Sequence, residues 1–203
     1  MDGTLIDSRL PVERHWRRWA SSRGLDADAI LRVAHGRRTT ETVAEFLPAS
    51  EIASAVAELD ALELSDSAGT TAIPGAHTLL ASLPAHAWAI VTSAGRELAG
   101  MRLAAAGVAP PRTMITSEEV TRGKPDPEGF LLAARLLGVE AAKCVVFEDA
   151  PPGIAAGMAA GARVVALPTT QPRERLAGAT VIIEDYRALR ITPDGAGWQI
   201  EIP

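Results

Sequence analysis

Cys144-Val145-Val146-Phe147-Glu148-Asp149 is the stretch that decides the fold of this 203-residue chain. Two acidic residues directly follow four apolar ones, as they do where a buried strand ends. An uncompensated pair of carboxylates in an apolar interior would cost several kcal/mol, on the order of 2–7 for each polar group. We therefore predict a buried strand over 144–147 that ends at a polar site.

Outward from this stretch, the chain from Pro74 onward alternates short apolar runs with amphipathic helices. Asp126 is a suitable helix cap, and Pro127 suits the first position of the helix that follows. Alternation of strands and helices predicts an α/β fold with a parallel sheet covered on both faces. The reactive loops of such a sheet lie at the carboxyl ends of its strands. We expect strands at 88–91, 113–115, 144–147, 163–167 and 181–183, helices at 96–106 and 127–137, and a hairpin around 194–195.

Residues 9–72 have a different pattern, which predicts helices and no strand. Val12, Trp16, Trp19 and Ala20 fall on one face of the first helix. We expect later helices at 26–33, 42–47 and 51–64, with Asp26 and Ser50 as caps, and a linker at 65–71. The predicted organisation is a core made of 1–8 and 73–203, with a helical insertion at 9–72.

The composition excludes several classes of protein. Apolar residues make up 47% of the chain and the formal net charge is −5, which argues against disordered, collagenous and coiled-coil chains. A mildly acidic chain has no general attraction for nucleic acid or anionic membranes. No apolar stretch reaches the roughly 20 residues that span a bilayer. We expect no nucleic-acid or membrane partner and a cytoplasmic location, and the sequence leaves the oligomeric state open.

Four short motifs now give a more specific hypothesis. Asp-Gly-Thr begins at Asp2, Thr92-Ser93 closes an apolar run, Lys124 lies in a Gly-Lys-Pro loop, and Glu148-Asp149 follows the buried strand. In this order and spacing they resemble the motifs of the haloacid dehalogenase superfamily. The later stretches 152–154 and 160–162 resemble its phosphoglycolate-phosphatase-like and sugar-phosphatase-like branch. The resemblance spans roughly residues 2–167 and implies a Rossmann-like parallel sheet with an inserted helical cap.

The resemblance also implies a reaction, the hydrolysis of a phosphate monoester through a phosphoaspartate. Asp2 matches the residue that protonates the leaving alcohol and then deprotonates water, as a general acid and base. Lys124 would meet the phosphate and the attacking carboxylate as a compact point charge. The Thr92 hydroxyl, with backbone N–H groups at Ser93, would hold a phosphoryl oxygen.

The same resemblance implies a Mg²⁺ site. Hard carboxylate oxygens suit this ion, which binds through one or two carboxylates together with water and substrate phosphate. We predict Asp149, Glu148 and Asp2 at the metal. Which member of the Glu148-Asp149 pair contacts the ion directly is open, and we favour Asp149.

The loop between two predicted cap helices carries His35-Gly36-Arg37. It is similar to the specificity loop of the sugar-phosphatase and polyol-phosphatase branch. Gly36 allows close approach of the backbone to a ligand, and Arg37 offers several donors. The alternative is a solvated loop between helices. We expect the substrate to be a small sugar or polyol monophosphate.

The motif at Asp2 is incomplete, because the resemblance places the attacking aspartate directly before Met1 and the central first strand before that. Either the working protein starts upstream of Met1, which we favour, or the chain is a truncated, catalytically inactive binding protein. We expect no more than trace turnover by the chain as printed.

Other activities of the superfamily fit less well. A phosphoglucomutase-like phosphotransferase stays an alternative, although it and a phosphonatase typically use a cap lysine, and 9–72 contains none. A dehalogenase lacks the acid/base aspartate that Asp2 matches.

Overall fold

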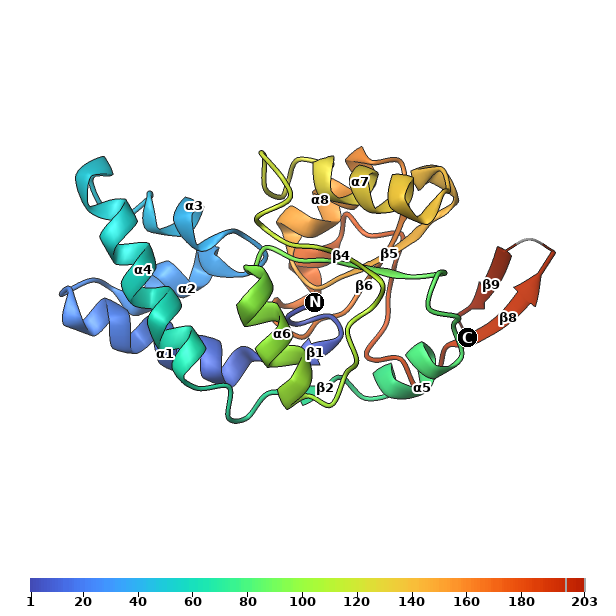
Figure 1. Cartoon of the computed structure of the whole chain (residues 1–203), viewed down its shortest axis with the longest axis horizontal. Helices are drawn as coiled ribbons and strands as arrows, with labels where there is room; N and C mark the ends of the chain where they lie inside the picture. The colour runs from blue at the N-terminus through green and yellow to red at the C-terminus, as the bar shows by residue number, and fades with distance from the viewer. Residues whose placement is uncertain (196, 203) are drawn as a thin grey trace.

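The computed structural model describes residues 1–195 and 197–202, which form a helical cap and an α/β core. Figure 1 shows the cap on the left and the core on the right, with the N-terminus at the centre of the core. The cap helices are α1 (Arg9–Ser22), α2 (Ala27–Ala34), α3 (Thr39–Val43) and α4 (Ala49–Ser65).

One apolar cluster holds the cap together. Trp19, Ile30, Val43 and Leu59 are almost fully buried, and Trp16 packs edge-on against Trp19 with ring centroids 5.6 Å apart. These side chains come from all four helices, so the apolar faces of the helices pack against one another within the cap.

Two predicted helix ends in the cap are corrected by the structure. The expected helix at 42–47 is instead α3 at Thr39–Val43, because Glu41 accepts hydrogen bonds from the Arg38 backbone and side chain and so starts the helix earlier. Ser50 is not a cap, since α4 begins at Ala49 behind Pro48. Proline lacks an N–H and its φ suits a helix start, so Pro48 takes the position before the first turn.

The two connections between cap and core lie side by side. Strand β1 (Ile6–Asp7) pairs antiparallel with β2 (Thr71–Ala72). We expected no strand within 9–72, and β2 corrects that expectation. The pairing gives hydrogen-bond partners to backbone N–H and C=O groups in both connections, and neither connection could provide these partners alone.

The core is the predicted α/β arrangement, in which three strand pairs (β3–β4, β5–β6 and β6–β7) are parallel in the described residues. Its strand and helix ends differ from the sequence-based ranges by at most one residue; α7, for example, begins after Pro127, and Asp126 accepts from the Glu128 N–H at 3.0 Å. The strands are β3 (Ala89–Val91), β4 (Thr113–Ile115), β5 (Val145–Glu148), β6 (Arg163–Ala166) and β7 (Val181–Ile182). The helices are α5 (Ala76–Ala81), α6 (Arg96–Ala105), α7 (Glu128–Leu137) and α8 (Pro151–Ala159), with short 3₁₀ turns at Ala141–Lys143 and Arg173–Leu176.

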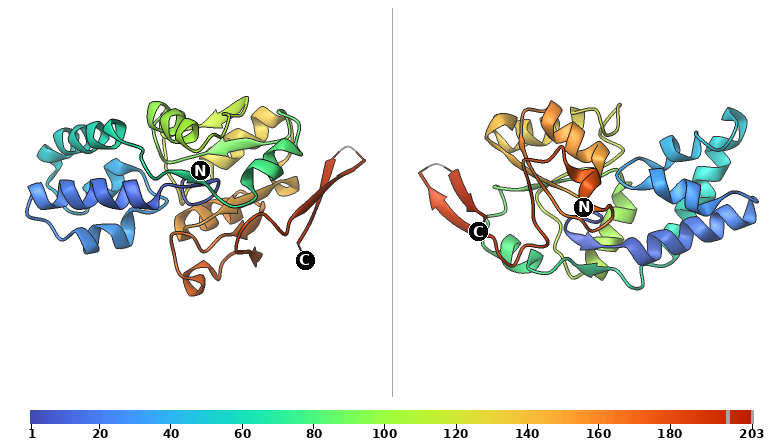
Figure 2. Two further views of the ribbon diagram at one scale, coloured as in Figure 1. Left: turned by 90° about the horizontal axis from the view of Figure 1, so that it is seen from below. Right: turned by 180° about the vertical axis from the view of Figure 1, so that it is seen from behind.

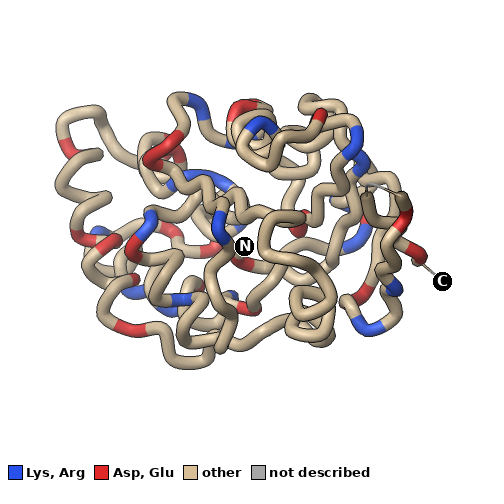
Figure 3. The backbone as a smooth tube through the Cα atoms, turned by 45° about the vertical axis from the view of Figure 1, so that its right-hand side comes forward, with Lys and Arg blue, Asp and Glu red and all other residues tan. Residues whose placement is uncertain are grey.

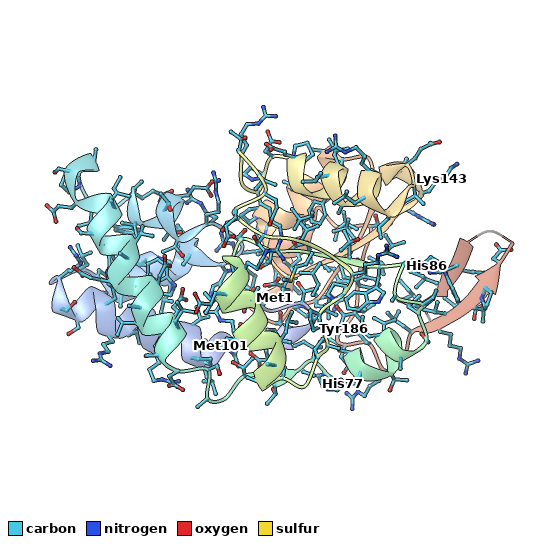
Figure 4. All side chains as sticks on the ribbon, in the orientation of Figure 1. Met1, His77, His86, Met101, Lys143 and Tyr186 are labelled. Carbon is cyan, nitrogen blue, oxygen red and sulfur yellow. The ribbon has the colours of Figure 1, made fainter. Side chains whose placement is uncertain are left out.

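The core sheet is interrupted in the middle. Within the described residues, β3 pairs only with β4, and β5 pairs only with β6 in the series β5-β6-β7. Residues 1–6 lie between the two halves: Met1 packs in a cluster with Ile90 of β3, and Thr4 bonds to Asp149 after β5. Figure 4 places Met1 near the core centre, and the nearby Tyr186 hydroxyl donates to the Thr4 carbonyl at 3.0 Å.

The predicted hairpin is present as β8 (Arg190–Asp194) and β9 (Gly197–Glu201), and it projects from the core on the side away from the cap (Figure 2). Basic and acidic residues alternate over the chain without a large region of one sign (Figure 3). Of the helices described, none combines the length and the apolar character needed to cross a membrane.

Candidate active site

A cleft with a volume of about 90 Å³ lies between the cap and the core. All nine residues that the sequence analysis proposed for the site line it. They are Asp2, His35, Gly36, Arg37, Thr92, Ser93, Lys124, Glu148 and Asp149.

The strands explain why such distant residues meet. Thr92 follows β3 and Asp149 follows β5, and carboxyl ends of parallel strands lie at one edge of a sheet. The Thr92 side chain is buried, and its hydroxyl accepts from the Ala94 N–H at 3.2 Å. The predicted hydroxyl ligand is therefore fixed at the strand end.

Lys124 and Glu148 form a buried ion pair at the cleft floor, with side chains 9% and 3% exposed. The Lys124 ammonium also donates to the Val91 carbonyl of β3 at 3.3 Å. A Cβ at Gly153 would lie 2.1 Å from the Glu148 carboxyl carbon, so glycine alone leaves room for this carboxylate. Lys124 is thus positioned as a fixed positive charge that spans the ends of β3 and β5.

Asp149 is held by two hydroxyls. Oδ1 accepts from Thr4 at 2.8 Å, and Oδ2 accepts from Thr170 at 2.5 Å. Burial, followed by the neighbouring charge of Glu148, raises the pKa of Asp149 to about 6. Gly3 has a φ of +66°, and a Cβ there would lie 2.2 Å from Oδ2, so the tight turn after Asp2 also requires glycine.

Asp2 lies at the other side of the same cleft. Its Oδ1 accepts from the Ser8 hydroxyl at 2.5 Å and from Arg102 Nη1 at 3.1 Å. Burial opposes ionisation of Asp2, but the positive charges of Arg102 and of the Met1 amino group, together with the Ser8 hydrogen bond, outweigh it, so the pKa lies below its usual value.

The carboxylates of the cleft differ in how well they fit Mg²⁺. No group of three or more His, Cys, Asp or Glu side chains in the described parts of the chain is arranged to hold a metal. Mg²⁺ does not require one, since it binds through one or two carboxylates with water and phosphate. Glu148 is paired with Lys124, and Asp2 is engaged by Arg102 and Ser8. Asp149, which has hydroxyl partners only, therefore fits best.

The predicted specificity loop closes onto the core from the cap. The Gly36 carbonyl accepts from the Ser93 hydroxyl at 3.0 Å, and Arg38 Nη1 donates to the Thr121 carbonyl at 3.2 Å. Arg37 lines the cleft but forms an ion pair with Glu45 of the cap. Burial lowers the pKa of His35, which favours its neutral form.

Three residues near the site were missed in the sequence. Arg102 and Glu63 form a buried ion pair at 2.8 Å, and Thr170 holds Asp149. Glu63 follows Val56 and Leu59 at helical spacing. The sequence alone therefore placed an acidic residue on an apolar helix face, and this could have indicated a buried partner. Thr170 offered no comparable signal, because a threonine in a loop is common.

Comparisons with known proteins agree with this geometry. A family model described as haloacid dehalogenase-like hydrolase matches residues 1–161. Hexitol phosphatase A of Escherichia coli (strain K12) is 37% identical over 202 residues, which cover 97% of this chain and 94% of that protein. Glycerol-1-phosphate phosphohydrolase 2 of Saccharomyces cerevisiae is 33% identical, over 94% of this chain and 82% of that protein. The crystal structure of a hydrolase from Pseudomonas syringae superposes with a TM-score of 0.77 at 27% identity, over 91% of each chain.

Proposed function

The chain belongs to the haloacid dehalogenase-like hydrolase family, and we propose that it is a phosphatase acting on a small sugar or polyol monophosphate. The observation that carries the proposal is the convergence of Asp2, Thr92, Lys124 and Asp149 on one cleft beneath a cap. The names of two relatives, a hexitol phosphatase and a glycerol-1-phosphate phosphohydrolase, support this substrate class. The fold alone would not, because one fold serves many reactions.

Each of these residues has a distinct role in the proposal. Lys124, fixed by Glu148, attracts the anionic phosphoryl group, and the Thr92 hydroxyl holds one of its oxygens. Asp2 donates a proton to the leaving oxygen and takes one from water in the second step. Mg²⁺ at Asp149 would offset the repulsion between the phosphate and an attacking carboxylate. Closure of the cap through Ser93 and Gly36 excludes water during the first step.

We place the attacking aspartate directly before Met1 in a longer form of the protein. The support is the interruption of the sheet: among the residues that the structure describes, β3 and β5 each pair on one side only, and Met1 is 7% exposed between them. A strand between β3 and β5 that ended before Met1 would bring its last side chain to the carboxyl edge, next to Lys124. It would also pair backbone groups that are costly to leave unpaired in a core.

The test compares three proteins. One is the 203-residue chain. The other two carry about five additional apolar residues before Met1, and the extension ends in Asp in one form and in Asn in the other. Phosphate release from glycerol 1-phosphate and from hexitol phosphates is measured with Mg²⁺. We expect release by the Asp form, none by the Asn form and at most a trace by the printed chain. The nucleophile assignment is wrong if the printed chain matches the Asp form. Phosphate passed to a second sugar, with none released, would instead indicate a phosphotransferase.

A further inference from the structure

A buried ion pair joins the cap to the core beside the cleft. Glu63, in the last turn of α4, accepts from Arg102 Nη2 of α6 at 2.8 Å, and the side chains are 5% and 7% exposed. Helices α4 and α6 lie side by side where the two lobes meet (Figure 1). The pair therefore sits at the boundary that any ligand in the cleft must approach.

Arg102 places Glu63 close to the leaving-group end of the cleft. While Nη2 binds Glu63, Nη1 of the same guanidinium binds Asp2 at 3.1 Å. One planar group therefore separates Glu63 from the carboxylate that protonates the leaving oxygen in the proposed reaction. Both carboxylates line the cleft, and the phosphate-binding residues Lys124 and Thr92 lie on its core side.

Stability alone gives a weak reason for glutamate at this position. Glu63 extends the apolar face of α4 that carries Val56 and Leu59, where a large apolar residue would bury more apolar surface. Replacing buried ion pairs with apolar residues is often neutral or stabilising by about 1–4 kcal/mol. Burial raises the pKa of Glu63, because the ionised carboxylate loses its contact with water.

Glu63 also has unused hydrogen-bonding capacity, and its charge is not the one that pairs with the arginine that the sequence suggested for substrate. Oε1 is bound to Arg102, whereas Oε2 makes no hydrogen bond to any other described residue. Arg37 is already paired with Glu45. A carboxylate is an acceptor only, so a ligand group bound there must be a donor such as a hydroxyl.

We propose that Glu63, held in place by Arg102, is a specificity-determining residue that accepts a hydrogen bond from a hydroxyl of the leaving alcohol near its ester oxygen. This rests on the proposed phosphatase function and narrows its substrates to polyol-like esters. An ester without that hydroxyl would leave the carboxylate desolvated and unpaired, which is how polar sites reject apolar analogues.

The test measures binding of three probes to the full chain with Mg²⁺ by calorimetry: glycerol 1-phosphate, propyl phosphate and inorganic phosphate. Propyl phosphate has the same carbon chain without the hydroxyls. We expect wild type to prefer glycerol 1-phosphate by about tenfold, or 1.4 kcal/mol. Glu63→Ala should bring that ratio close to one and leave the Kd of inorganic phosphate unchanged.

Two further variants keep the result interpretable. Glu63→Gln retains the size and the contact with Arg102, so it should fold even if the alanine variant does not, and it should still lower the ratio. Glu58→Ala removes an exposed glutamate from the same helix, where it pairs with Arg23, and should leave the ratio unchanged.

The outcomes separate the two proposals. An unchanged ratio in both Glu63 variants, or an equal loss of affinity for all three probes, would show that Glu63 has only a structural role. If wild type bound none of the probes, the specificity proposal would fail, whereas the phosphatase proposal is decided separately by phosphate release from the Asp-extended form.

Discussion

The cap and the core bury different kinds of side chain. The cap has one continuous apolar cluster drawn from four helices, whereas the core has three separate clusters around an interrupted sheet. At the cleft the core buries Lys124, Glu148, Asp149 and Arg102, each with a charged or hydroxyl partner. The difference indicates that the cap is organised for packing and the core for holding charge.

Unpaired polar atoms follow the same division. Every buried side-chain polar atom found without a partner in the described residues lies between positions 15 and 70, including His15 Nδ1 and Trp19 Nε1. Such orphaned groups cost about 1–3 kcal/mol each. In the cleft, by contrast, the buried charged groups contact one another or a hydroxyl. Glu63 is an exception among the buried polar residues of the cap, because its partner Arg102 belongs to the core.

The largest effect is expected from adding the strand that we propose before Met1. Adding the apolar strand ending in Asp before Met1 should raise the free energy of unfolding by roughly 5 kcal/mol or more, since each buried apolar side chain contributes about 1.5–3. Urea unfolding and hydrogen exchange at β3 and β5 measure it. A Gly/Ser extension of equal length should add nothing. If the apolar extension and the Gly/Ser extension gave equal stability, the proposal of a strand between β3 and β5 would be refuted.

Breaking the cap should have the next largest effect. Leu59→Ala removes a fully buried side chain from the cap cluster and should cost about 2–5 kcal/mol. Hydrogen exchange should show lost protection in α1, α2 and α4 and unchanged protection in β5 and β6. Leu10→Ala, at a side chain 62% exposed, is the matched control and should change stability by less than about 0.5 kcal/mol. Equal loss of protection in both lobes would show that cap and core unfold as one unit.

Removing a charge from the core should stabilise it. The pKa of Asp149 is about 6 in the folded chain against 3.8 ordinarily, so its ionised form opposes folding above pH 6 and the cost vanishes below about pH 4. Without metal, Asp149→Asn should therefore add about 1–3 kcal/mol at pH 8 and nothing near pH 4. Thermal melts at both pH values check the sign. Thr170→Val, which removes a hydroxyl partner, should instead destabilise, and a less stable asparagine variant at pH 8 would contradict the argument.

The smallest expected effect is at the contact between the lobes. Ser93→Ala removes the hydrogen bond to the Gly36 carbonyl and should cost about 1 kcal/mol. Chemical denaturation gives the value, and small-angle scattering should show a wider separation of cap and core. Ser54→Ala, whose hydroxyl bonds only within α4, serves as the control for scattering. An unchanged profile for Ser93→Ala would mean that this bond does not hold the cap closed.

Much of this molecule was accessible from the sequence. The apolar run before Glu148-Asp149 predicted β5 to within one residue, and alternating strands and helices predicted the parallel core. Periodicity and helix stops are local, so they survive folding unchanged. The errors, at α3, at Ser50 and at β2, arose where an Arg38–Glu41 contact, a neighbouring proline or a segment about 65 positions away decided the outcome.

For the site, the sequence supplied the residue types and their order, because the strand ends at Thr92 and Asp149 are recognisable one at a time. Only the tertiary structure decided their partners: Lys124 on Glu148, Thr170 on Asp149, and Arg102 between Asp2 and Glu63. Residues 39 to 100 positions apart form the last of these contacts. Local patterning cannot encode such pairs, since they depend on how the strand ends of the core come together and, for Arg102 and Glu63, on how the cap packs against the core.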